Sequence, residues 1–242
     1  VQRETLKTLK SGLADDEVII IADFSERFLS KAAREIQSAF FGKHQISIFT
    51  VRVHVGINEY SYIIVSDTKN QSKYEVYAYF QKILELVKEN HPDIRHVFLF
   101  TDGCAQQFKN RFNFLNLLHS ESDFGVTMEW HFFATSHGKS AAAVLGGSIT
   151  QHVLNIVISS DTQVYSAKDF VEVASKFVDK MIVFEMTDDE ITKRSSFLKT
   201  RWEPVESVKR IPGTQAHHFF KCSDKEGFIE AAITSRGDEC KE

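Results

Sequence analysis

Two short apolar runs that each lead into an aspartate constrain the fold of this chain more than any other feature. The run VIIIA at 18–22 precedes Asp23, and the run VFLFT at 97–101 precedes Asp102. Apolar runs of this length, bounded by polar residues, are typical of strands buried on both faces of a sheet. The sequence therefore predicts a sheet covered by helices on both sides, with an aspartate late on two of its strands.

The order of the other segments predicts how these strands connect. Three strands come first, at 18–24, 45–56 and 61–67, and the last two form an antiparallel hairpin. Helices and strands then alternate: a helix at 73–90, a strand at 96–103, a helix at 105–122, a strand at 125–135 and a helix from about 148 to 160. This order gives a five-stranded mixed α/β sheet with helices on both faces, which is the order of the ribonuclease H-like fold.

The last third of the chain continues with a helix, a short strand at 182–186, a helix capped by Thr187 and a further strand within 216–222. No linker rich in Pro, Gly or Ser separates it, so we expect a C-terminal α+β appendage packed on the core. The expected organisation is a lead-in at 1–16, a ribonuclease H-like core at 17–160 and the appendage at 161–242.

Charge and cysteine content limit the classes of function. The formal net charge of -4 gives no global basic signal for nucleic acid, so any such surface has to be local. Cys104, Cys222 and Cys240 form no CxxC pair, which predicts free thiols in a reducing compartment. We expect no membrane span, because no apolar run approaches the roughly 18 residues that a membrane-spanning helix needs.

The two aspartates suggest a metal site. In the predicted order their strands are neighbours, so Asp23 and Asp102 would face each other at one edge of the sheet. Paired carboxylates are hard oxygen ligands for Mg²⁺ or Mn²⁺ and serve phosphoryl transfer. The alternative is structural: Asp102-Gly103 is a strand-to-helix turn and Asp23 is a cap.

Four segments carry a resemblance to a known family. IADFSERF, EIQSAFFGKHQISIFTV, HVFLFTDGCAQQFKNRFNFLNL and WHFFATSHGKSAAAVLGG resemble the core of transposase-like DDE proteins of animal genomes, over residues 18–150. The resemblance implies a ribonuclease H-like (retroviral-integrase-like) fold in a domesticated, nuclear protein. It matches Asp23 and Asp102 to the first two acids of the metal-binding triad.

The third acid of that family is missing. Where the relatives have aspartate and glycine, this chain has Ala143 and Val144, and no Asp or Glu occurs from 130 to 160. The resemblance therefore implies weak or vestigial binding of Mg²⁺ or Mn²⁺ at Asp23 and Asp102, or no cofactor. Glu26 and Glu129 are the candidates for a substitute ligand.

Several basic or metal-ligating side chains have a functional and a structural interpretation. His137 and Lys139 could contact a phosphate at a helix N-terminus, or be turn residues. Lys109 and Arg111 could contact nucleic acid, or belong to a solvated helix face. His217, His218 and Cys222 have a loosely metal-like spacing, but a buried strand is the favoured interpretation.

The preferred functional prediction is a catalytically inactive, transposase-derived domain that binds a protein partner, and possibly DNA or RNA, in the nucleus, without membrane contact. The alternative is an active metal-dependent DNA nuclease or transposase that uses Asp23, Asp102 and a displaced acid. A third prediction is a platform for proteins alone, which the net charge of -4 mildly favours over DNA binding.

Overall fold

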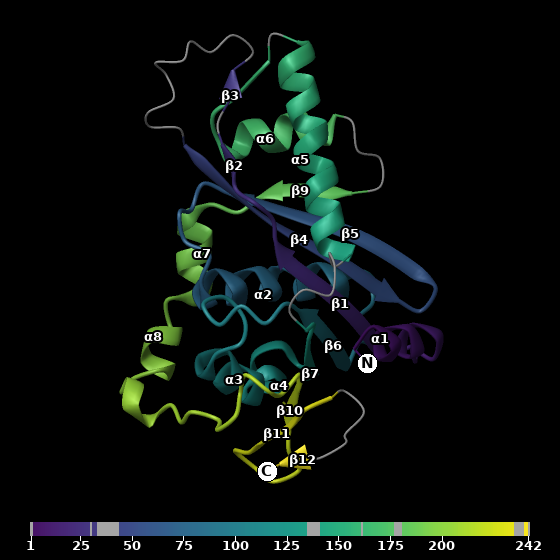
Figure 1. Ribbon diagram of the computed structural model, residues 1–242, viewed down its shortest axis with the longest axis vertical. Coiled ribbons are helices and arrows are strands. Elements are labelled where there is room, and N and C mark those ends of the chain that lie inside the picture. The colour runs from purple at the N-terminus through teal and green to yellow at the C-terminus, as the bar shows by residue number, and fades with distance from the viewer. Residues whose placement is uncertain are drawn as a thin grey trace.

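A computed structural model of the chain describes residues 2–29, 31–32, 44–134, 141–160, 162–176, 181–234 and 240–241 (Figure 1). Five strands form the centre of its main sheet. They are β1 (Glu17–Phe24), β4 (Gln45–Val55), β5 (Asn58–Ser66), β6 (His96–Thr101) and β7 (Thr127–Phe132).

The order of these strands is β5-β4-β1-β6-β7. β4 pairs antiparallel with both β1 and β5, whereas β1, β6 and β7 run parallel. This arrangement confirms the predicted ribonuclease H-like mixed sheet. The antiparallel pairs are neighbours in sequence, and each parallel connection passes through helical segments.

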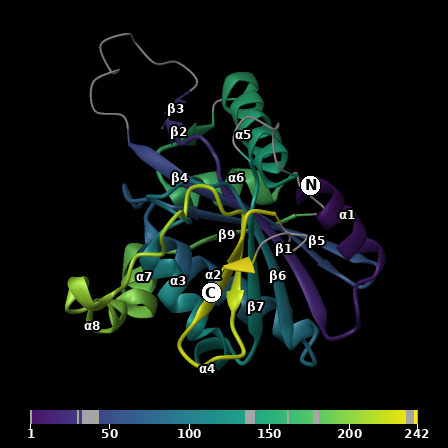
Figure 2. The same cartoon turned by 60° about the horizontal axis from the view of Figure 1, so that its bottom comes forward.

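The C-terminal third extends this sheet at both edges. β9 (Ile182–Glu185) pairs parallel with β5, and β10 (Phe219–Cys222) pairs antiparallel with β7. β11 (Ile229–Ala232) and β12 (Cys240–Lys241) continue beyond β10, and Figure 2 shows the C-terminal strands in yellow near β7. The C-terminal third is therefore hydrogen-bonded into the sheet, while the predicted boundary at residue 160 stays a prediction.

Small strands and helices complete the architecture. β2 (Phe28–Leu29) pairs with β4, and β3 (Lys31–Ala32) pairs with β8 (Gln163–Val164). The predicted lead-in contains a helix. The helices are α1 (Gln2–Ser11), α2 (Lys73–Asn90), α3 (Arg111–Leu118), α4 (Ser120–Phe124), α5 (Ala141–Ser159), α6 (Ala167–Ser175), α7 (Asp188–Ser195) and α8 (Leu198–Arg201), with a 3₁₀ turn at Val205–Ser207.

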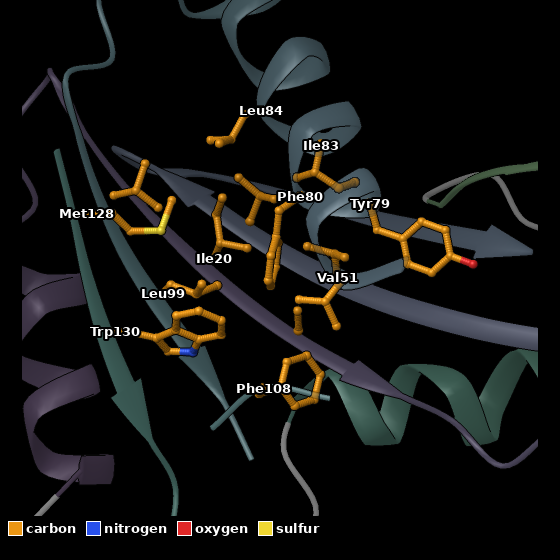
Figure 3. Close-up of a cluster of buried hydrophobic side chains, with 14 of the residues drawn as sticks. Ile20, Val51, Tyr79, Phe80, Ile83, Leu84, Leu99, Phe108, Met128 and Trp130 are labelled. Carbon is orange, nitrogen blue, oxygen red and sulfur yellow. The ribbon is translucent and has the colours of Figure 1, made fainter. Parts of the chain in front are cut away.

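Alternation along the strands divides the core between the two faces of the sheet. Ile20 of β1 and Leu99 of β6 belong to the cluster with α2, whose residue Phe80 lies close to them (Figure 3). Ile19 and Ile21 belong to a different cluster, which includes Ala142 of α5. The two buried runs therefore pack on both faces, as the sequence predicts.

Two predicted helices have other boundaries in the structure. The helix expected at 105–122 begins only at Arg111, because the Asn110 side chain accepts from the Asn113 backbone N–H and caps it. The helix expected from about 148 is α5, which begins at Ala141 and so includes the small residues before it. The sequence pattern missed this start because alanine and glycine carry little periodic signal.

The length and composition of one helix contradict the expectation that no segment is apolar enough to span a membrane. α5 has 19 residues and is long and apolar enough to cross a membrane on length and composition alone. In the fold, Leu145, Ile149 and Val153 of α5 are buried against β4 and β5 residues such as Ile48. Core helices of folded domains pass the same test of length and composition.

Candidate functional site

The two aspartates lie at the C-terminal ends of adjacent parallel strands, Asp23 near the end of β1 and Asp102 directly after β6. β1 and β6 pair from Glu17 with His96 to Ile21 with Phe100, a constant offset of 79 positions. If the same offset continues for two positions beyond this pairing, Asp23 comes level with Asp102. Neighbouring strands lie about 4.8 Å apart, so this register is compatible with the pairing of the two carboxylates at one edge, which stays a prediction.

The start of α5 is fixed to the same end of β1. Thr50, the cross-strand partner of Asp23, donates through Oγ1 to the Ala142 carbonyl at 2.8 Å, and its Oγ1 also lies 3.2 Å from the Asp23 carbonyl. Four residues along α5, Gly146 has so little space that an added Cβ would overlap Ser25 Oγ. The first turns of α5 therefore lie directly against the residues that flank Asp23.

Ala143, which the resemblance to DDE proteins matches to the third acid, lies in the first turn of α5. Ala143 is half-buried and follows the carbonyl that Thr50 holds, and its neighbour Val144 is 54% exposed. α5 contains no Asp or Glu along its whole length. The helix thus packs beside the residues that flank Asp23, but it carries no carboxylate.

Burial and a backbone hydrogen bond, and no cationic side chain, shift the pKa of the Asp102 carboxyl group. Desolvation raises the pKa of its carboxyl group, and the hydrogen bond from the Cys104 backbone N–H to Oδ1, at 2.9 Å, opposes this rise. A carboxylate must be deprotonated to bind a metal ion, so a raised pKa weakens the site further.

The remaining donor set does not fit a two-ion centre. Within the described ranges, no group of three or more His, Cys, Asp or Glu side chains is arranged to hold a metal ion. Asp23 and Asp102 supply two carboxylates, whereas a pair of divalent ions carries four positive charges and needs bridging oxygen ligands. We therefore derive no metal-dependent step at this site.

Glu129 does not replace the missing ligand. It pairs with Phe98 across β6 and β7, four positions before Asp102, which corresponds to about 13 Å along the strand. Its carboxylate lies 3.7 Å from His96 Nε2 and 3.6 Å from His131 Nε2. Burial raises its pKa, but the hydrogen bond and charge of His131, together with His96, lower it overall. Glu129 belongs to a separate polar cluster.

Glu26 is the candidate substitute ligand that lies close to Asp23 in the sequence. It is exposed and follows Asp23 by three residues, just beyond the end of β1. His137 and Lys139, the predicted phosphate contacts between β7 and α5, lie outside the described residues, and their role stays a prediction.

Lys109 and Arg111 are held by the protein itself. Lys109 is 4% exposed, donates to the Gln215 carbonyl at 3.1 Å and lies 5.4 Å from the centre of the Phe132 ring. Burial lowers the pKa of its ammonium group. Arg111 is half-buried and donates to the Val208 carbonyl at 3.0 Å. These contacts assign both side chains a structural role, whereas their predicted contact with nucleic acid stays a prediction.

The histidines and cysteine near β10 bind main-chain carbonyls rather than one another. β10 itself confirms the strand interpretation of this segment. His217 Nδ1, His218 Nδ1 and Cys222 Sγ donate to the carbonyls of Gly213, Phe132 and Leu117, at 2.7, 3.0 and 3.3 Å.

Sequence reasoning missed the residues that seat α5. Thr50 and Ser25 carry no motif of their own, and only the pair Gly146-Gly147 gave a signal of close packing. The two glycines have different surroundings in the structure. Gly146 is buried, whereas a Cβ added at Gly147 would meet nothing within 4 Å.

The fold is similar to solved nuclease domains at low identity. The Mn-soaked human cytomegalovirus terminase nuclease domain is 10% identical, with 86% of this chain and 80% of that chain covered and a TM-score of 0.29. Its inhibitor-bound form is 8% identical, with 85% of each chain covered and a TM-score of 0.32. NurA with manganese is 8% identical, with 95% of this chain and 49% of that chain covered and a TM-score of 0.23. At such scores individual residues do not correspond, so the fold assignment rests on the strand order.

No curated protein matches the chain. A family profile, in contrast, matches residues 2–235 and so spans every central strand and the edge strands β9 to β11. The chain therefore belongs to the family described as a domain of unknown function (DUF8701).

Proposed function

We propose that this domain is a ribonuclease H-like domain of transposase origin that has lost catalysis and acts as a binding module. One observation carries the proposal: Ala143 stands in the first turn of α5, where that helix meets the residues flanking Asp23. The pairing of β1 with β6 supports a position of Asp23 close to Asp102, but the helix beside Asp23 offers no carboxylate.

The physical reason is the charge and coordination that two divalent ions require. Metal-assisted phosphoryl transfer uses two ions about 3.5–4 Å apart, held by several oxygen ligands. Two carboxylates leave most of this positive charge uncompensated. Selection for function then acts on surfaces that recognise a partner rather than on the reacting centre.

Restoring the carboxylate tests the proposal. We expect the wild-type protein to leave labelled DNA uncleaved in Mn²⁺ and to bind Mn²⁺ weakly in calorimetric titration. Ala143→Asp should bind Mn²⁺ at least tenfold more tightly, because an acid in the first turn of a helix completes the ligand set and is favoured there. Ala143→Asn, which has nearly the same shape and no charge, is the matched control and should not.

Cleavage by the wild-type protein that disappears in Asp102→Asn would overturn the loss of catalysis. It would favour the second candidate, an active nuclease with a displaced acid. This second function is supported by Glu26, which is exposed just beyond the end of β1 and could supply the displaced acid. In that case Glu26→Gln should abolish cleavage as well, whereas Glu129→Gln should not.

The kind of partner is tested by salt. Binding to DNA or RNA gives an affinity that falls steeply as the salt concentration rises, because counterions are released from the phosphates. Absence of binding at low salt would assign the module to a protein partner, in line with the net charge of -4.

A further inference from the structure

A cavity of about 880 Å³ lies between α3, the segment 207–212 and the β-hairpin that contains β11. Residues of α3 form one wall, and Figure 1 shows the chain from α8 to β10 running close to this helix. Its residue Phe114 belongs to the cluster with α2, on the face of the sheet opposite α5. The volume is within the range of about 300–1,000 Å³ typical of small-molecule sites.

The charged residues that line the cavity are all basic. Among the lining residues that the structure describes, none is Asp or Glu, although the whole chain has a net charge of -4. The basic lining residues are Arg111, Arg201, Lys209, Arg210 and the histidines His119 and His217. An anion is therefore the complementary ligand.

These cations differ in how much charge they offer. Arg201 forms a double ion pair with Asp123, with both N–O distances at 2.7 Å, so its charge is compensated. Arg111 donates to the neutral carbonyl of Val208 and keeps its charge. Lys209 and Arg210 are exposed at the rim. The cavity thus keeps an excess positive charge.

Apolar and aromatic residues also line the cavity. Leu115 and Leu118 of α3 face it together with Ile229 of β11. Phe228, at the hairpin, is 44% exposed, and the Lys225 ammonium group lies 4.3 Å from the centre of its ring. An exposed aromatic ring can stack on a nucleobase, and the Lys225 ammonium group already lies over one of the two faces of Phe228.

We propose that this cavity binds a nucleotide. Lys209, Arg210 and Arg111 hold the phosphate, and the apolar lining residues together with Phe228 hold the base. The nucleotide is either free or part of a single strand of nucleic acid, since both present the same phosphate and base. The site is distinct from the aspartate pair, which does not line it.

The test is a titration with AMP and with fluorescein-labelled dT10, at 50 mM NaCl, by calorimetry and anisotropy. We expect binding of at least one, weakened at least tenfold in the double variant Lys209→Ser/Arg210→Ser. The double variant Lys193→Ser/Lys199→Ser is the matched control. It removes the same charge from two exposed residues outside the cavity and should bind within twofold of wild type. Phe228→Ala should weaken AMP severalfold.

The two sources of nucleotide give different results. A free nucleotide is the ligand if AMP displaces dT10, and a single strand is the ligand if only dT10 binds. No binding of either probe, equal losses in the two double variants, or inorganic phosphate binding as tightly as AMP would overturn the proposal. Because neither double variant touches Asp23 or Asp102, Mn²⁺ binding stays unchanged and the two proposals fail independently.

Discussion

Replacing Gly146 with alanine tests the seat of α5, on which the assignment of Ala143 to the site depends. A Cβ added at position 146 would overlap Ser25 Oγ, lie 2.8 Å from Ser25 Cβ and lie 3.2 Å from Thr50 Cγ2. Gly147, the next residue of the same helix, is exposed and would meet nothing within 4 Å. The two glycines therefore form a matched pair, in which only one substitution meets the sheet.

The expected magnitudes have opposite signs. Alanine is favoured over glycine in a helix interior by about 1 kcal/mol, so Gly147→Ala should raise the free energy of unfolding by roughly 0.5–1 kcal/mol. At Gly146 the same gain is opposed by overpacking, which costs about 1–3 kcal/mol. Displacement of α5 also breaks the hydrogen bond from Thr50 to Ala142, which contributes about 1 kcal/mol. Gly146→Ala should therefore lower the free energy of unfolding by roughly 1–3 kcal/mol.

Urea unfolding followed by circular dichroism measures both variants. For a chain of this size each kcal/mol moves Tm by about 2–4 °C, so thermal melts give a second readout. The double variant Ser25→Gly/Gly146→Ala removes the overlapping side chain, and its loss should be smaller than the sum of the single losses by at least about 1 kcal/mol. Equal stability of Gly146→Ala and Gly147→Ala would refute the packing of α5 on Ser25.

Further predictions concern the buried His54 and the ion pair of Asp123 with Arg201. Burial lowers the pKa of His54 to about 4, so the unfolded chain takes up its proton first as the pH falls. Stability should therefore fall between about pH 6.5 and 4, by about 1–2 kcal/mol after solvent screening, and urea midpoints for His54→Asn should lack this decline. Asp123→Asn should lower stability by about 2–3 kcal/mol, because it leaves the half-buried Arg201 without its ion pair. Tyr77→Phe, which removes one 2.9 Å hydrogen bond to Asp123, should cost only about 1 kcal/mol in the same urea titration.

The sequence alone determined the central sheet. Uninterrupted apolar runs report burial on both faces, and the order of strands and helices leaves few ways to connect them. The same runs located Asp23 and Asp102, since parallel strands place their carboxyl ends at one edge. Counting acids was enough to see that the segment from 130 to 160 has none, because composition needs no coordinates.

Only the tertiary structure decided which distant segments meet. Residues 25 and 146 touch across 121 positions (146 − 25), and no local periodicity reports that contact. β9 and β10 joined the two edges of the central five strands through backbone groups that any sequence offers, so their side chains gave no sign of which edge they would take. The burial of Lys109 and the basic cavity likewise arise from residues gathered from separate segments. The sequence records which side of its own strand or helix a residue faces, whereas the partner across the gap is fixed only when the elements pack.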